Sequence, residues 1–248
     1  MLPKSQLQFI KSLHQKKFRK EHGFFIVEGL KSITEFLYSD YVIHSIYYLS
    51  KVEPKIDIFP KNIKHYLISE KELAAISSLK TPQGILAIIY LPPQKEIDEN
   101  LLKNTFSLVL DNVQDPGNLG TVIRTADWFG VPNIICSLDT VEAFNPKVVQ
   151  ATMGSLAHIA LFYTDLSLFL AKTSIPVYAA LLTGESIYKT TFGNEGLILL
   201  GNEGNGINKS LIMEQTKGIT IPRFGKAESL NVAISAAIFC SEIKRLLR

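Results

Sequence analysis

Three segments rich in Asn, Gly and Glu, each placed directly after an apolar run, constrain this chain most. They are residues 110–124 (LDNVQDPGNLGTVIR), 200–206 (LGNEGNG) and 221–232 (IPRFGKAESLNV), called here the first, second and third motif. In α/β proteins, ligands bind in the crevice beyond the carboxyl ends of the strands. Three such loops within the C-terminal half therefore predict one composite binding site.

The apolar pattern predicts an α/β protein with two parts. In the first part strands are expected over residues 24–27, 42–49, 66–68 and 85–91, and helices over 5–17, 29–38 and 70–79. The proline-rich, charged stretch 92–100 is typical of a linker, which predicts domains at 1–98 and 99–248. In the second part, short and continuously apolar strands are typical of a parallel sheet covered on both faces. They are expected over 107–110, 133–136, 177–181 and 197–200, with helices over 118–129, 165–172 and 230–247.

Composition excludes several classes of protein. No apolar run approaches the ~18 residues of a membrane span, and the N-terminus lacks a secretory signal. Cys136 and Cys240 lie in apolar surroundings far apart in the sequence. They are expected to be buried free thiols, which fits a cytoplasmic protein. The five histidines show no ligand spacing, so no metal site is expected.

Positive charge is concentrated near the N-terminus. Residues 1–98 carry 14 Lys/Arg and 10 Asp/Glu, and Lys16, Lys17, Arg19 and Lys20 form its densest group. These side chains fit either a solvated helix face or a patch that contacts RNA phosphates, because cations supply most sequence-independent affinity for nucleic acids. The three motifs favour the RNA interpretation.

Each motif allows a structural and a functional interpretation. In the first, Asn118 is expected to cap the helix that carries Arg124, and Arg124 either pairs with Asp127 in solvent or faces a cleft. In the second, glycines such as Gly201 let a ligand approach the backbone, and Glu203 supplies a carboxylate. In the third, Ser229 is the expected cap of the last helix.

Together, and in this order, the motifs resemble those of the SpoU (TrmH-like) family of RNA ribose 2′-O-methyltransferases, part of the SPOUT superfamily. The resemblance implies a C-terminal SPOUT-type α/β trefoil-knot domain preceded by a small α/β RNA-binding domain. It implies S-adenosyl-L-methionine as cofactor, ribosomal RNA as substrate in preference to transfer RNA, and a homodimer. Trp128 and Phe129 are candidate contacts in that dimer.

The resemblance also assigns roles to residues. The positions at or near the reacting centre are Arg124, Asn118, Glu203, Ser229 and Asn231. The cofactor is expected along Gly201, Ile221 and Leu230, with Leu181, Leu182 and Thr183 on its adenine side. Residues 145–155 resemble a family stretch beside the active site. Arg223 and Gln150 depart from the residues common in the family, which bears on the target RNA.

Two questions stay open at the level of sequence. Arg124 is the family's candidate for deprotonating the ribose hydroxyl, yet arginine holds its proton at neutral pH, so electrostatic stabilisation is the alternative role. A non-catalytic RNA-binding protein that retains the fold is the alternative function. A dinucleotide-binding enzyme is disfavoured because the glycines do not follow that fingerprint.

Overall fold

The computed structural model describes residues 2–94, 96–202 and 204–246, apart from the side chain of Pro54. The chain forms two compact units, one of residues 1–93 with 142–157, the other of residues 94–141 with 158–248. Nothing in the composition of residues 142–157 marked this stretch as belonging to the first unit. The division of RNA binding and catalysis between residues 1–98 and 99–248 stays a prediction.

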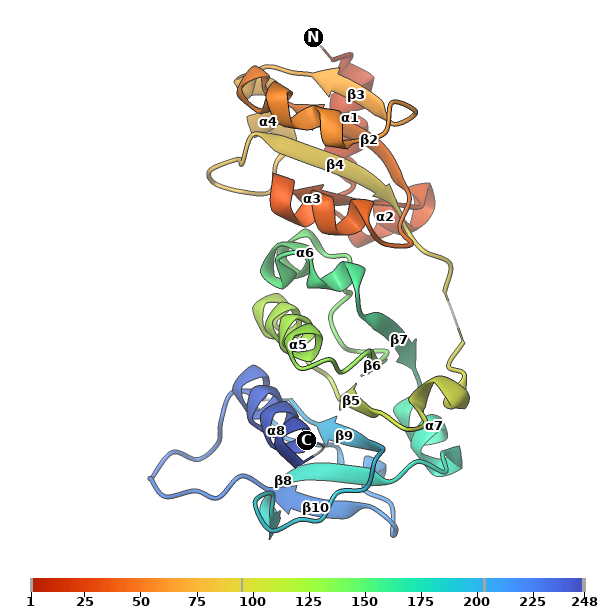
Figure 1. Cartoon of the computed structure of the whole chain (residues 1–248), viewed down its shortest axis with the longest axis vertical. Helices are drawn as coiled ribbons and strands as arrows, with labels where there is room; N and C mark the ends of the chain where they lie inside the picture. Colours follow the sequence, from red (N-terminus) through yellow and green to blue (C-terminus); the bar gives the residue numbers. More distant parts are fainter. Residues whose placement is uncertain (1, 95, 203, 247–248) are drawn as a thin grey trace. The chain divides into compact units, whose positions relative to one another are not determined.

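The first unit is an α/β layer built on a mixed sheet (Figure 1). In its described residues the strands are ordered β1-β4-β2-β3, with β4 antiparallel to both neighbours and β3 parallel to β2. The strands are β1 (Phe24–Glu28), β2 (Ile43–Tyr48), β3 (Lys64–Leu67) and β4 (Ile85–Tyr90). The helices are α1 (Lys4–Ser12), α2 (Lys16–His22), α3 (Leu30–Leu37), α4 (Glu70–Ile76) and α6 (Pro146–Thr152), with 3₁₀ turns at η1 (Ser50–Ile58) and η3 (Ser155–Ala157).

Helices cover both faces of this sheet. Alternate strand residues such as Ile26 and Ile88 pack against Ile10 and Leu13 from the first helical segment and against α4. On the other face, the ring of Phe25 contacts Phe36 of α3 and Phe144, which precedes α6. This alternation is the period-2 pattern of a strand with two buried faces.

The second unit is a parallel α/β sheet of strands that follow the order β10-β8-β9-β5-β6-β7 across the described residues. The strands are β5 (Phe106–Leu110), β6 (Asn133–Ser137), β7 (Ala160–Thr164), β8 (Val177–Ser186), β9 (Gly196–Leu200) and β10 (Lys217–Thr220). The helices are α5 (Pro116–Trp128), α7 (Leu166–Lys172) and α8 (Val232–Leu246), with 3₁₀ turns at η2 (Glu99–Leu102) and η4 (Lys209–Leu211). The predicted α/β class is confirmed.

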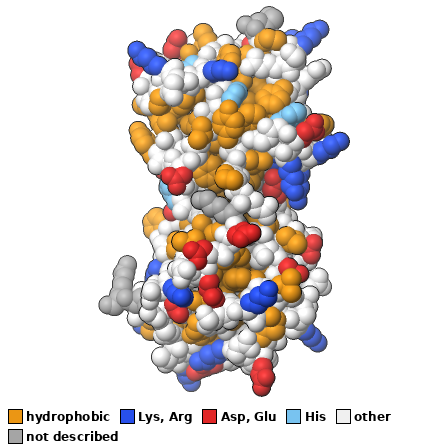
Figure 2. Space-filling view, turned by 90° about the vertical axis from the view of Figure 1, so that its right-hand side faces the viewer, with side chains coloured by type: hydrophobic (Ala, Val, Ile, Leu, Met, Phe, Trp, Pro, Cys, Tyr) orange, Lys and Arg blue, Asp and Glu red, His pale blue; other side chains and the backbone are white. Residues whose placement is uncertain are grey.

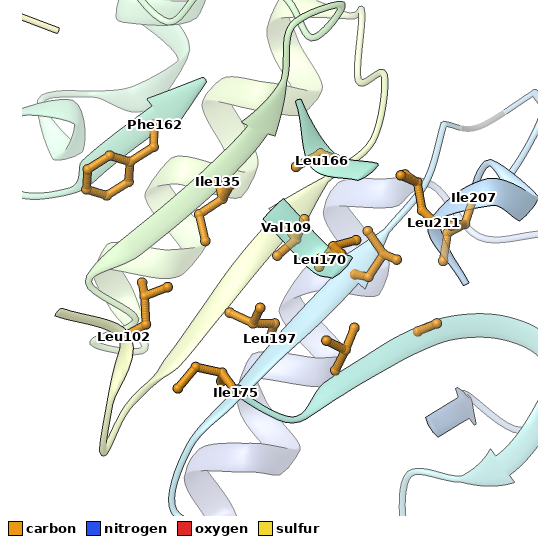
Figure 3. Close-up of a cluster of buried hydrophobic side chains, with 13 residues drawn as sticks. Leu102, Val109, Ile135, Phe162, Leu166, Leu170, Ile175, Leu197, Ile207 and Leu211 are labelled. Carbon is orange, nitrogen blue, oxygen red and sulfur yellow. The ribbon is translucent and has the colours of Figure 1, made fainter. Parts of the chain in front are cut away.

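Helices also cover both faces of the parallel sheet. Figure 3 shows Val109, Ile135 and Leu197 on one face, in contact with Leu166 and Leu170 of α7. The opposite face is covered by α5 and α8, which pack against each other (Figure 1). Both faces are buried, which explains why these strands are apolar at every position rather than at alternate ones.

Some predicted boundaries are wrong. The helix expected over residues 5–17 is two helices, because Leu13 ends α1 and Gln15 adopts an extended conformation before α2. The side chain of Arg19 donates to the carbonyl oxygens of Leu13 and His14, which satisfies two acceptors that the break leaves open. The short strands β7 and β10 were not predicted. The trefoil knot stays a prediction.

Candidate active site

The first and second motifs leave the sheet side by side. β5 and β9 are neighbouring parallel strands, and Leu110 lies opposite Leu200 at their carboxyl ends. β6, the strand that follows β5 in the chain, lies on the other side of β5. The carboxyl ends of β9 and β5 therefore lie at a topological switch point, where open α/β sheets bind their ligands.

Hydrogen bonds connect the first motif to the second. Asn202 donates from Nδ2 to the carbonyl oxygen of Asn112 at 2.8 Å, and the backbone N–H of Asp111 donates to the carbonyl oxygen of Leu200 at 2.9 Å. Asp111 is nearly buried and accepts from the N–H of Asn208 at 2.8 Å. Sequence reasoning overlooked Asp111 and Asn202 as positioning residues. The available signal was a polar residue one position after β5, at Asp111, and two positions after β9, at Asn202.

The second motif is a tight loop whose shape depends on glycine. Asn202 and Gly206 exchange backbone hydrogen bonds of 3.0 and 2.8 Å, and Gly206 has a φ of +68°. A Cβ on Gly201 would lie 2.2 Å from the carbonyl carbon of Gly206. The loop can therefore close only if residue 201 is glycine. From the sequence, Gly201 was expected to let a ligand approach the backbone. Glu203 lies outside the described residues.

Two predicted helix caps are wrong. α5 begins at Pro116 because Asp115 accepts from the N–H of Asn118 at 2.8 Å, so Asp115 rather than Asn118 is the cap. The N–H groups of Ala233 and Ile234 donate to Oδ1 of Asn231, so Asn231 caps α8 in place of Ser229. In both cases the capping side chain lies next to the first free N–H groups of its helix.

The corrected caps explain how the third motif joins the first. Nδ2 of Asn231 donates to Oδ1 of Asn118 at 2.9 Å, a bond between residues 113 positions apart. Arg124 lies on the exposed side of α5. Asp127, the partner that one alternative gave to Arg124, instead lies with its Oδ2 atom 3.2 Å from Nδ1 of His158. The structure thus brings Asn118 and Asn231 into contact with each other.

A cavity of about 600 Å³ lies between residues 180–182 of β8, the loops that follow β9 and β10, and the start of α8. Its lining includes Gly201, Ile221 and Leu230, together with Leu181, Leu182 and Ser229. Thr183, Asn118, Arg124 and Asn231 are not part of that lining within the described residues. The volume and the mixture of apolar side chains with glycine backbone are typical of a site for a small organic molecule.

Arg223 also lines this cavity, and its guanidinium donates to the carbonyl oxygen of Ala227 at 3.3 Å. Residues 223–231 are exposed and form the loop that precedes α8 (Figure 1). Arg223, which departs from the residue common in the resembled family, therefore bridges its own loop. Gln150, the second departure, lies on α6.

The basic residues of α2 do not behave alike. Lys16, Lys17 and Lys20 are exposed, as expected for phosphate contacts. Arg19 is only 2% exposed, and its guanidinium pairs with the carboxylate of Glu142 at 2.6 Å. The prediction of Arg19 as an RNA contact is corrected, because burial and four hydrogen bonds hold its guanidinium inside the unit.

The two cysteine thiols lie outside the lining of the cavity. Cys136 and Cys240 are buried free thiols, as predicted, and burial raises the pKa of Cys240 to about 12. Groups of three or more His, Cys, Asp or Glu able to hold a metal ion are absent from the described part of the chain. Within the same residues, each helix is too short or too polar to cross a membrane.

Comparison with known proteins places this geometry in a family. Residues 105–241 match the SpoU rRNA Methylase family, and residues 4–87 match the MRM3-like substrate binding domain. The first match covers all three motifs. The chain belongs to the SpoU rRNA methylase family. It is an RNA ribose 2′-O-methyltransferase that uses S-adenosylmethionine.

Relatives resemble the methyltransferase over nearly its whole length. It is 34% identical over 239 residues to RlmP, the 23S rRNA (guanosine(2553)-2′-O)-methyltransferase of Bacillus subtilis (strain 168), with 94% of each chain covered. A TrmH-family structure from Porphyromonas gingivalis matches with a TM-score of 0.90 and 36% identity, covering 99% of each chain. An AdoMet-bound rRNA methyltransferase from Sinorhizobium meliloti matches with a TM-score of 0.88 and 29% identity, covering 100% of this chain and 97% of that one.

The cavity of the methyltransferase fits its cofactor. Leu181, Ile221 and Leu230 would provide an apolar wall for the adenosine, and Gly201 and Gly206 place backbone groups in the lining, with open space beside Gly206. Apolar walls with a few directed backbone groups are what a neutral nucleoside requires. When bound, S-adenosylmethionine supplies an electrophilic methyl group, so the protein's own task is to orient and activate the ribose hydroxyl.

Proposed function

We propose that the methyltransferase modifies the 2′-hydroxyl of a guanosine in ribosomal RNA. The observation that carries the proposal is the convergence of the three motifs beside the cavity, through the Asn202–Asn112 and Asn231–Asn118 hydrogen bonds. Support for the target comes from RlmP, which is named for a guanosine of 23S rRNA. Within the proposal, the protein is cytoplasmic, in keeping with its two free thiols.

Arg124 is proposed as the residue that acts on the RNA. Its exposed guanidinium can bind the phosphate next to the target ribose and stabilise the alkoxide that forms as the 2′-hydroxyl loses its proton. Asn118 lies six residues before Arg124 on the same helix, and its side chain accepts a hydrogen bond from Asn231. Ser229, which lines the cavity, and Glu203 are the remaining members of the proposed catalytic set.

We assign RNA binding to residues 1–98 and catalysis to residues 99–248. The match of residues 4–87 to a substrate binding domain supports this division. Lys16, Lys17 and Lys20 of α2 are the proposed phosphate contacts, and Arg19 is removed from that set because it is buried.

We also propose a homodimer that forms through α5 and α8. Trp128 at the end of α5 is 84% exposed, and Ile234 of α8 is 53% exposed. A hollow of about 400 Å³ lies between the two helices, with Thr121, Thr125 and Ala237 in its lining. An exposed tryptophan beside an apolar hollow is a surface that a second subunit would cover. Phe129 is partly buried and extends this surface.

The target is tested by methyl transfer to unmodified RNA. Ribosomal and transfer RNA transcripts are incubated with labelled S-adenosylmethionine, and ribose methylation is mapped by resistance to alkaline cleavage. Label on a guanosine of ribosomal RNA is expected. Label on transfer RNA alone would reject the target, and RNA binding without any transfer would favour the non-catalytic alternative.

The cofactor position is tested separately by calorimetry. Gly201→Val is unsuitable because the loop itself would be disrupted. Leu182 and Leu230 are exposed and line the cavity, so Leu182→Asp and Leu230→Asp are expected to fold and to weaken cofactor binding roughly tenfold or more. Leu168→Asp, at an exposed leucine of α7, is the matched control. Unchanged affinity in both cavity variants would reject the placement.

A further inference from the structure

Six rings form a continuous row on the surface of the first unit, called here the aromatic row. Successive ring centroids lie between 4.7 and 6.1 Å apart, within the range of direct ring contacts. The members come from α1, α2 and three strands, and they are Phe18, His22, Phe9, Phe24, Tyr90 and His44. None of these rings takes part in the active site described above.

The fold leaves part of this row exposed. Phe24 begins β1 and pairs in register with Tyr90 at the end of β4, so both rings stand on the sheet face that carries Ile26 and Ile88. α1 and α4 bury the two isoleucines, but Tyr90 remains 44% exposed. His44 lies at the register shift of β2, and such irregularities re-aim a side chain.

The surface view agrees with this arrangement. Figure 2 looks onto the side of the first unit where α2 and the end of β4 lie in Figure 1. Hydrophobic and histidine side chains gather on that side, with Lys and Arg side chains near its margin (Figure 2). His22 and Tyr90 are exposed, and the other members of the row are partly buried.

Lysines flank the row at both ends. Nζ of Lys17 lies 5.7 Å from the ring centroid of Phe18. At the other end, Lys64 pairs in register with Ser45, the neighbour of His44. Burial, followed by the charge of Lys64, lowers the pKa of His44, which favours its neutral imidazole. Lys16 and Lys20 are also exposed on α2, where Glu21 is the exposed acid.

We propose that the aromatic row stacks unpaired bases of the RNA substrate while the flanking lysines bind its phosphates. This inference rests on the proposed function and adds the class of RNA feature that the first unit recognises. Every base offers a π-face, and proteins read splayed-out RNA bases by stacking them on Phe, Tyr and His. Rings between cations complement an RNA strand, which alternates apolar base faces with anionic phosphates.

The test compares a short single-stranded RNA that carries one 2-aminopurine with the same strand annealed to its complement. Phe24→Leu and Tyr90→Leu keep an apolar side chain at each position but remove the π-face. Each is expected to weaken binding of the single strand by roughly 5- to 150-fold, the effect of losing one stacked base. The fluorescence quenching of 2-aminopurine on binding is expected to disappear with the ring. The salt dependence of binding should stay unchanged, because the phosphate contacts remain.

Tyr38→Leu is the matched control, since Tyr38 is 78% exposed on the same unit and outside the row. Row variants that bind and quench like the control would overturn the inference, as would equal losses for single strand and duplex. A change in sedimentation without a change in RNA affinity would instead identify a protein interface. Failure of the wild-type protein to bind or methylate RNA would reject the proposed function and not the row alone.

Discussion

Arg124 lies on the exposed side of α5 and is not among the residues that line the cavity, so its proposed role is separate from cofactor binding. Arg124→Ala is expected to lower the single-turnover rate of methyl transfer by about 10²–10³-fold, the usual effect of removing an electrostatic stabiliser. Cofactor affinity by calorimetry should stay close to that of the wild type. Lys172→Ala, at the end of α7, is the control. A loss of cofactor affinity equal to the loss of rate would contradict the assignment.

Glu72 illustrates a residue whose charge stabilises the fold. Its carboxylate accepts from the backbone N–H and hydroxyl of Ser69, in a capping box of α4, and from the N–H of Leu2. The hydrogen bond from the backbone of Ser69 is the largest cause that lowers the pKa of Glu72 from 4.5 to about 2. Because the folded-state pKa is depressed, the stabilisation is complete above pH 4.5 and is lost as the pH falls towards 2.

Glu72→Gln is therefore expected to reduce the free energy of unfolding by about 1–3 kcal/mol at pH 7. The difference from the wild type should shrink between pH 4.5 and pH 2. Urea denaturation across this range measures both effects. Glu70→Gln, at an exposed residue in the same helical turn, is the control and should change little. A constant difference at all pH values would show that the charge of Glu72 has no part in it.

At the scale of elements, α2 has one face for packing and another for solvent. Replacing Lys16, Lys17 and Lys20 together by Ala should leave the melting temperature nearly unchanged, because all three are exposed. RNA affinity should fall, and the plot of log K against log salt should lose up to about 0.7–0.9 of slope per phosphate contact removed. An unchanged slope would reject these lysines as phosphate contacts.

Arg19→Met provides the contrast on the same helix. It leaves the carboxylate of Glu142 without its buried partner and two carbonyl oxygens without a donor. Losing one member of a buried ion pair typically costs about 3–5 kcal/mol. The melting temperature should therefore drop, and the salt slope of RNA binding should be retained. The opposite pattern would restore Arg19 to the RNA contacts.

For the whole molecule, the exposed surface of α5 and α8 predicts association. Sedimentation at micromolar concentration is expected to give a dimer, and Trp128→Glu should shift it towards monomer because a charge would replace the largest exposed apolar side chain of α5. Leu138→Glu, at another exposed apolar residue of the second unit, should not. A wild-type protein that sediments only as a monomer would contradict the proposed dimer.

The residue patterns by themselves were enough for the α/β class, most of the strands and the family. Continuous apolar runs such as 197–200 are typical of strands covered on both faces, and the motifs keep their order along the chain. The resemblance to the family implied that Gly201, Ile221 and Leu230 lie beside the cofactor; all three line the cavity, and their contact with the cofactor stays a prediction. The class and the strands depend on local periodicity and on residue type, which a sequence displays directly.

Only the tertiary structure decided which polar groups meet. Asn231 rather than Ser229 caps α8, and its second amide atom reaches Asn118 from 113 residues away. Arg19 and Lys17 look equivalent in the sequence, but one turns inward to Glu142 and the other stays in solvent. The aromatic row likewise joins segments from residue 9 to residue 90. Hydrogen bonds, ion pairs and ring contacts of this kind depend on distances between remote segments, and those distances are set by the packing of the whole unit.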